Sequence, residues 1–368
     1  MMKTLLCMAT DHNIVNIQPL SQIDVDKVVV FITERMKPSS ETLIQEIKRS
    51  VKNVETLYIE KENSLRALHE QFSKWLENNI DDEIIVNITG GTKPMSLTAY
   101  QLFSEWGFRC FYCDKDQSQL IWLDDESAIS NIGSKMGLEQ YLRSYRYKIT
   151  NKTPLAQIPK SYKDYANILY QELCKLGKYD DTCKLIGKIH ALTQENPISI
   201  TGFSQNEMAL LEHLQRETGL FTYKNNAITC QDSETRKFLC GGWLEVIVAD
   251  SLRANDCRDI CQSVYFEIST QRKGRTTLQE LDVMAMCQDK LLLVECKAKN
   301  WHGSTAEASE AIYKLGSLSN IGGLNTVAVF VSLYNLTDTA KTRAAENGIY
   351  VIAGQSDFQA LKSKLNFK

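Results

Sequence analysis

Two carboxylates and a lysine in the C-terminal part of the chain have the types and the spacing of a hydrolytic metal site. Residues 280–299 predict two β-strands, because strand-type apolar residues flank a Gln-Asp pair at 288–289 that favours a turn. With the turn centred on that pair, Asp282 lies opposite Glu295. Lys297 shares a face with Glu295, because side chains alternate along a strand. The hairpin therefore gathers two carboxylates and one ammonium group on one face.

Facing carboxylates repel each other across a ladder, and a divalent cation removes that cost. Oxygen ligands of this kind suit Mg²⁺ or Mn²⁺, with water in the remaining positions. A lysine beside such an ion can help to activate a water molecule or neutralise charge on a phosphate. The pattern therefore predicts metal-dependent hydrolysis of phosphodiesters. The alternative is an edge hairpin whose charges face water, and a three-residue turn would shift the register and break the pairing of Asp282 with Glu295.

An acidic residue at the end of one strand, an E-x-K motif at the end of the next and a glutamate on a preceding helix resemble the PD-(D/E)XK nuclease superfamily. The matching residues are Asp282, Glu295 with Lys297, and Glu245. Segment 243–252 is apolar nearly all round and predicts a buried helix, in which the carboxylate of Glu245 needs a partner. The resemblance implies a metal held by Asp282, Glu295 and Glu245. Lys297 would orient or deprotonate the attacking water; alternatively, Glu245 lies at a frayed helix start.

The expected order of elements after residue 236 is helix, three strands, helix, strand, helix, strand and helix, which matches that superfamily. A basic tip between the first two strands, followed by two further lysines, could neutralise substrate phosphates: Arg272, Lys273, Arg275, Lys299 and Lys314. The alternative for the tip is a solvated hairpin loop.

Strands and helices alternate over residues 1–150, which predicts a parallel, doubly wound sheet with ligand-binding residues beyond the carboxyl ends of its strands. We expect strands at 3–9, 27–33, 55–59, 83–89, 109–113 and 119–123 and helices at 41–52, 64–78 and 94–106, with caps at Ser40 and Asn63. The strand ends are polar: Thr10, Asp11, Asn13; Thr33, Glu34, Arg35; and Thr89, Gly90, Gly91, Thr92, Lys93. The Gly-Gly turn before a helix favours an anion, although a plain strand–helix connection is the alternative.

Taken with the nuclease pattern, these loops resemble the CARF domains of type III CRISPR defence. The resemblance implies a sensor of cyclic oligoadenylates in which the polar residues at the strand ends bind the ligand. It further implies a homodimer that binds one ring, here cyclic tetra-adenylate, across its two-fold axis.

Residues 151–235 predict a small helical module. Asn151 to Pro154 are expected to begin a linker, and Ser204 with Glu207 forms a capping box. A hairpin with an Asn-Asn turn at 225–226 follows, so that the module resembles a winged helix. Its helix is acidic, which favours a structural spacer over a DNA reader.

The composition is that of a globular protein, and the net charge of −3 leaves any nucleic-acid contact to local patches. No apolar run reaches the length of a membrane span, and the eleven cysteines are expected to be reduced thiols, in a cytoplasmic protein.

Together these patterns predict an α/β protein with a CARF-like sensor at 1–150, a linker module at 151–235 and a PD-(D/E)XK nuclease at 236–368. The predicted activity is cleavage of DNA or RNA, preferentially single-stranded, with Mn²⁺ or Mg²⁺, switched on by cyclic tetra-adenylate. The alternatives are a ligand-responsive DNA-binding regulator with an inactive nuclease-like domain, and a restriction-type enzyme acting on duplex DNA.

Overall fold

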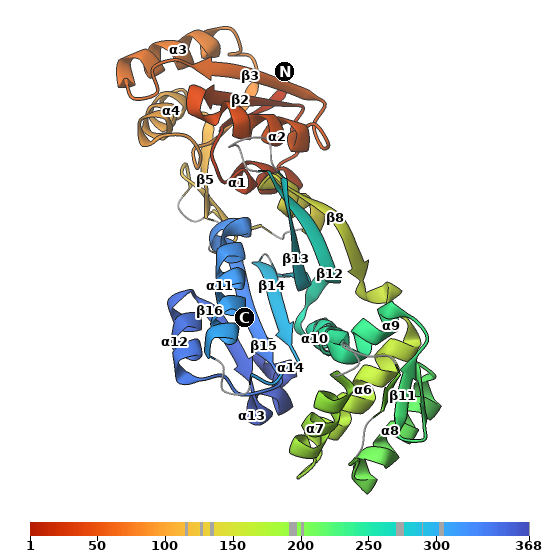
Figure 1. Ribbon diagram of the computed structural model, residues 1–368. Helices are drawn as coiled ribbons and strands as arrows, with labels where there is room; N and C mark the ends of the chain where they lie inside the picture. Colours follow the sequence, from red (N-terminus) through yellow and green to blue (C-terminus); the bar gives the residue numbers. More distant parts are fainter. Residues whose placement is uncertain are drawn as a thin grey trace. The chain divides into compact units, whose positions relative to one another are not determined.

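The computed structural model describes residues 1–114, 117–125, 128–132, 136–190, 197–199, 202–269, 276–288, 290–301 and 305–367 (Figure 1). It divides into two compact units. The first takes in Met1–Lys148, Glu267–Thr277 and Ile321–Asn325, and the second takes in Ile149–Phe266, Leu278–Asn320 and Thr326–Lys368. The finer division into three modules stays a prediction.

The first unit is built on a sheet of seven strands among its described residues, in the order β3-β2-β1-β4-β5-β6-β7. The strands are β1 (Lys3–Met8), β2 (Lys27–Thr33), β3 (Asn53–Ile59), β4 (Glu83–Asn87), β5 (Arg109–Asp114), β6 (Gln119–Trp122) and β7 (Ile129–Asn131). The pairs from β3 to β5 are parallel, and β6 and β7 add an antiparallel edge. The predicted parallel sheet is confirmed, and its inner strands β1, β2 and β4 are apolar and buried on both faces.

Helices cover both faces of this sheet. The helices are α1 (Ile14–Ile17), α2 (Lys37–Ile47), α3 (Leu65–Glu77), α4 (Lys93–Glu105) and α5 (Leu138–Ser144). On one face α3 and α4 pack around an aromatic cluster of Phe31, Phe72 and Phe103, and α1, α2 and α5 contact one another (Figure 1). Two expected caps are wrong: α2 begins at Lys37 with a proline in its first turn, and Ser64 caps α3.

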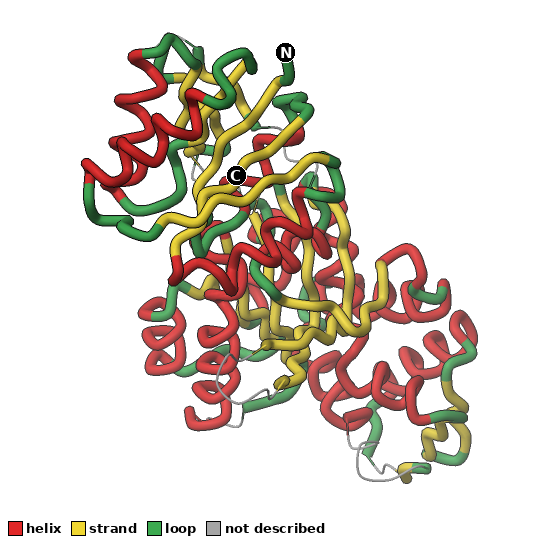
Figure 2. The backbone as a smooth tube through the Cα atoms, turned by 90° about the horizontal axis from the view of Figure 1, so that it is seen from above, coloured by secondary structure: helices red, strands yellow, loops and turns green. Residues whose placement is uncertain are grey.

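The second unit contains a described sheet of six strands in the order β16-β15-β14-β13-β12-β8, which Figure 2 shows among helices. The strands are β8 (Tyr147–Pro154), β12 (Cys257–Ser269), β13 (Thr276–Cys287), β14 (Lys290–Lys297), β15 (Thr326–Ser332) and β16 (Ile349–Ala353). The expected linker start at 151–154 is wrong, because these residues complete β8. β8 pairs with β12, more than a hundred residues away in the sequence, and this pairing decides its conformation. The Thr150 hydroxyl also donates to the Tyr265 carbonyl.

The remaining helices of this unit are α6 (Lys160–Cys174), α7 (Tyr179–His190), α8 (Gln205–Thr218), α9 (Ser233–Lys237), α10 (Trp243–Leu252), α11 (Thr305–Leu318), α12 (Asp338–Glu346), α13 (Gln355–Gln359) and α14 (Leu361–Lys364). A small sheet joins β9 (Ile198–Ser199), β10 (Phe221–Lys224) and β11 (Ala227–Cys230). The capping box of Ser204 and Glu207 is confirmed, as is the turn at Asn225 and Asn226, where φ is 52° and 58°.

One hydrophobic core runs from α6 and α7 through α10 to the sheet. Tyr165 and Leu169 of α6, Trp243 and Val248 of α10 and Val294 of β14 are all fully buried in the same cluster. The helices at 160–190 therefore share their core with the last domain. None of the helices that the structure describes is long and apolar enough to cross a membrane.

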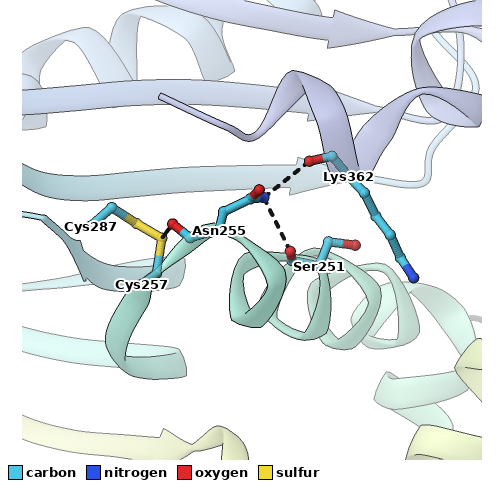
Figure 3. Close-up of a disulfide and its surroundings, with 5 residues drawn as sticks. All are labelled: Ser251, Asn255, Cys257, Cys287 and Lys362. Atoms are coloured by element: carbon cyan, nitrogen blue, oxygen red, sulfur yellow. Dashed lines mark hydrogen bonds between the residues drawn. A yellow bond between two sulfur atoms is a disulfide. The ribbon is translucent and has the colours of Figure 1, made fainter. Parts of the chain in front are cut away.

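The expectation that all cysteines are reduced is wrong for two of them. Cys257 and Cys287 form a disulfide between β12 and β13, with their Cα atoms 4.1 Å apart (Figure 3). Nearby, the Asn255 side chain donates to the carbonyls of Ser251 and Lys362 at 3.2 and 3.0 Å. The two cysteines are far apart in sequence, and the pairing of neighbouring strands brings them within bonding distance.

Candidate functional site

The predicted register of the β13–β14 hairpin is confirmed. Cys287 pairs with Lys290 and the ladder continues outward to Val283 with Val294, so that Asp282 and Glu295 are the next residues on the two strands. Gln288 turns the chain with a φ of 54°. A two-residue turn thus gives the register that the facing carboxylates need.

The two carboxylates and the lysine lie together as expected. The Nζ atom of Lys297 lies 2.6 Å from Glu295 Oε1 and 3.4 Å from Asp282 Oδ2. The backbone N–H of Cys296 donates to the same Asp282 oxygen at 2.6 Å. One ammonium group therefore bridges both acids, and the next strand holds the Asp282 carboxylate in place.

This group is largely withdrawn from water. The Glu295 side chain is 4% exposed and that of Asp282 is 15% exposed. Burial, together with the charge of Glu295, raises the pKa of Asp282 to about 6. Burial alone would lower the pKa of Lys297, but the charges of Asp282 and Glu295 outweigh it and raise that pKa above its ordinary value. The lysine is therefore an ammonium ion at neutral pH.

One oxygen of this site suits a cation. Glu295 Oε2 is buried and has no hydrogen-bond partner among the described residues, whereas Oε1 lies against Lys297 and 3.9 Å from Lys314 Nζ on α11. A buried carboxylate oxygen without a partner is costly, and a hard divalent ion would satisfy it. The donor set of Asp282 and Glu295 therefore fits Mg²⁺ or Mn²⁺.

Glu245 lies close to this pair on α10. It lies in the first turn of α10, directly after a break in the helical backbone at Gly241, so the alternative of a position at a helix start describes where it lies. Ser263 Oγ donates to Glu245 Oε2 at 3.3 Å, and burial, followed by the charge of Asp282, holds the Glu245 pKa well above its ordinary value. Among the described residues no three His, Cys, Asp or Glu side chains gather closely enough to form a metal site.

The residues expected to contact substrate differ in their positions. Arg272, Lys273 and Arg275 lie outside the described residues. Lys299 is exposed and pairs with Glu307 at 2.6 Å, while Lys314 approaches Glu295. Only Lys314 among the described members of this set therefore lies beside the two acids.

Two hydroxyl-bearing residues of β12 were not predicted. Besides Ser263, Tyr265 donates its hydroxyl to Glu280 Oε1 at 2.6 Å, and this bond, with burial, raises the Tyr265 pKa to about 12. Glu280 lies two residues before Asp282 on β13 and therefore shares its face. In the sequence, only the alternation of side chains along the strand indicates that Tyr265 faces away from the buried Val264 and Phe266.

The first unit has a pocket at the carboxyl ends of its strands. Its volume is about 240 Å³, and its lining comes from β1, β2, the start of α4 and the loop after β3: Ala9, Thr10, Asp11, Thr33, Arg35, Met36, Glu62, Gly91 and Thr92. Six of the predicted ligand-binding residues are among these. Glu62 was not predicted, because nothing local distinguishes it from other surface glutamates.

The other predicted ligand-binding residues make contacts elsewhere in the first unit. Asn13 is buried and donates to the carbonyls of Ser39 and Ser144, and Thr89 bonds Asn87. Glu34 pairs with Lys37, while Lys93 begins α4 behind its cap. None of these residues lines the pocket itself.

Two features set the chemistry of the pocket. Arg35 forms an ion pair with Asp11 at 3.0 Å, and both side chains are exposed. A Cβ atom on Gly90 would lie 2.2 Å from the Met8 carbonyl oxygen, and Gly91 has a φ of 78°. The turn therefore requires both glycines, and it presents the N-terminus of α4, capped by Thr92, to the pocket.

Two family models match the chain. Residues 4–141 match the Card1 CARF domain, and residues 232–367 match the Card1-like endonuclease domain. No curated protein matches the chain significantly.

Three solved structures share its fold. Can2 from Sulfobacillus thermosulfidooxidans, in complex with cyclic tetra-adenylate, has a TM-score of 0.80 over 100% of both chains at 23% identity. Protein VC1899 from Vibrio cholerae has a TM-score of 0.81 at 20% identity, over 99% of this chain and 97% of that one. A type III CRISPR defence DNA nuclease activated by cyclic oligoadenylate has a TM-score of 0.57 at 15% identity, over 91% of this chain and 47% of that one.

The predicted pairing of a CARF domain with an endonuclease domain is confirmed by these models, which together match well over half of the chain. The chain therefore joins a domain of the Card1 CARF family to a domain of the Card1-like endonuclease family.

Proposed function

We propose that this protein is a metal-dependent endonuclease that cuts single-stranded DNA or RNA and is switched on by cyclic tetra-adenylate in CRISPR defence. The observation that carries the proposal is the group of Asp282, Glu295 and Lys297, in which Glu295 keeps a buried oxygen without a partner among the described residues. The endonuclease family and the cyclic tetra-adenylate bound to Can2 support it.

In this proposal Asp282 and Glu295 hold Mg²⁺ or Mn²⁺, which when bound supplies positive charge for the attacked phosphate and lowers the pKa of a water. Lys297 remains an ammonium ion, so it orients the attacking water and stabilises phosphate charge by donating hydrogen bonds. Lys314, half exposed beside Glu295, adds a second cation for the substrate. Glu245 lies one step further out and acts through a water molecule.

The pocket of the CARF domain would bind the activator. The α4 N-terminus and Arg35 suit phosphates, while the carboxylates of Asp11 and Glu62 suit the amino groups of adenine bases. A ligand can activate the nuclease only if it binds the active state more tightly than the inactive one. We propose that two chains share one ring, and that its binding favours the competent arrangement of the two nuclease domains.

The test is cleavage of labelled single- and double-stranded DNA and RNA by the pure full chain with Mn²⁺, with and without cyclic tetra-adenylate. We expect single strands to be cut only with the ligand. Glu295→Gln should lose at least about a hundredfold in rate, because it weakens the metal site and the contact with Lys297. It should still bind the ligand, because Glu295 does not line the pocket of the CARF domain. Glu346→Gln, an exposed residue of α12, is the matched control and should cut normally.

The outcomes separate the parts of the proposal. Cutting that ignores the ligand would keep the nuclease and remove the sensor. Cutting by Glu295→Gln at the normal rate would overturn the assignment of the site. Ligand binding without cutting of any substrate would favour a ligand-responsive regulator.

A further inference from the structure

Strand β12 contains an unusual backbone conformation beside the nuclease site. Within its described residues Asp259 and Ser263 have φ values of 50° and 47°, in the left-handed region. Residues other than glycine seldom adopt this region, and within a strand it marks a bulge that bends the chain and re-aims a side chain. Such conformations persist where the surrounding structure holds them, often at functional sites.

At Ser263 the re-aimed side chain has a specific partner. Its hydroxyl donates to Glu245 Oε2 at 3.3 Å, and within the described residues no other hydrogen bond reaches that carboxylate. On α10 Glu245 shares a stripe with Val248, Ala249 and Leu252, which are all buried apolar residues. A carboxyl group in such surroundings has a defined orientation only if a polar partner fixes it.

Tyr265, two residues after Ser263 on β12, also contacts a carboxyl group. Val264 and Phe266, which flank Tyr265, are fully buried, while Tyr265 bonds Glu280 on β13. The hydroxyl of Ser263 thus contacts the carboxyl group of Glu245, and the hydroxyl of Tyr265 contacts that of Glu280. Both carboxyl groups belong to residues around Asp282. Asp259 has the same backbone conformation and is exposed.

We propose that Ser263 is a positioning residue of the nuclease site: it fixes the carboxyl group of Glu245 beside Asp282, toward the ion held by Asp282 and Glu295. The role rests on the proposed function. Partners of this kind orient the groups around a metal, and their loss typically lowers metal affinity about 10- to 100-fold. A bulge that only bends β12 would not need the hydroxyl.

The experiment separates the hydroxyl from the backbone. Ser263→Gly removes the hydroxyl and suits a positive φ, Ser263→Ala removes the hydroxyl alone, and Asp259→Gly makes the same backbone change at a position other than Ser263. For each full-length variant, Mn²⁺ is titrated into the metal-free protein and the free ion is measured by electron paramagnetic resonance. Thermal unfolding and ligand-activated cleavage are measured on the same samples.

We expect both Ser263 variants to bind Mn²⁺ about tenfold more weakly than wild type, and to cut more slowly at limiting Mn²⁺. Ser263→Gly should unfold within about 4 °C of wild type, because glycine relieves the backbone conformation. Asp259→Gly should keep wild-type Mn²⁺ affinity.

Wild-type Mn²⁺ affinity in Ser263→Gly and Ser263→Ala would overturn the positioning role and leave the proposed nuclease intact. Equal losses in Asp259→Gly would also overturn it, since the bulge and not the hydroxyl would then be responsible. A wild-type protein that binds no Mn²⁺ would overturn the proposed function itself, and the role of Ser263 with it.

Discussion

At the scale of single residues, Asp282 is an acid whose ionisation is shifted by its burial and by its charged neighbours. Burial and the charge of Glu295 oppose its negative charge, while Lys297 and the Cys296 N–H favour it, and the balance raises its pKa from 3.8 to about 6. An acid with a raised pKa favours the folded state most when it is protonated. Its contribution to stability is therefore complete below about pH 3.8 and is lost as the pH rises through about 6.

Asp282→Asn removes that titration. In metal-free protein we expect the stability of the variant relative to wild type to grow between pH 4 and pH 7, by up to about 3 kcal/mol for a shift of this size. Denaturant unfolding in the presence of a chelator, at intervals of half a pH unit, measures it. A difference that stays constant over this range would mean that Asp282 titrates normally in the fold.

At the scale of elements, the turn between β4 and α4 positions the sensor pocket. No side chain fits at Gly90, because its Cβ atom would collide with the Met8 carbonyl on the neighbouring strand β1. Gly107, at the other end of α4, has a φ of 81° and open space around it. Substituting Gly90 tests the effect of a steric clash, and substituting Gly107 tests the effect of a left-handed backbone conformation alone.

Gly90→Ala should destabilise the protein by about 2 kcal/mol or more, since backbone must move, and should abolish binding of cyclic tetra-adenylate. Gly107→Ala should cost about 1 kcal/mol through its backbone conformation alone and leave binding intact. Denaturant unfolding and calorimetric titration measure the two effects. Normal ligand binding by Gly90→Ala would show that the turn does not shape the ligand site.

At the scale of the whole molecule, the proposed activator site involves two chains. Calorimetric titration with cyclic tetra-adenylate should give about one ring per two chains, and the mass in solution should be that of a dimer with ligand bound. Binding of one ring per chain, by a species with the mass of a monomer, would contradict the shared site. Arg35→Ala should weaken binding without changing the mass, because it removes a pocket cation only.

The sequence by itself determined strands β1 to β6, the parallel sheet and the register that sets Asp282 opposite Glu295. These follow from local causes: the alternation of side chains along a strand, the length of a turn and the buried apolar runs. The six pocket residues at the ends of β1, β2 and β4 were predictable for the same reason, since parallel strands end at one edge.

Only the tertiary structure decided the features that depend on strands distant in sequence. The expected linker start at 151–154 is part of β8 because this segment pairs in the six-stranded sheet, and Cys257 meets Cys287 only because β12 and β13 are neighbours. Glu62 reaches the pocket from a loop that no local pattern marks. The left-handed backbone of Ser263 is imposed by its surroundings, because a serine has no intrinsic preference for it.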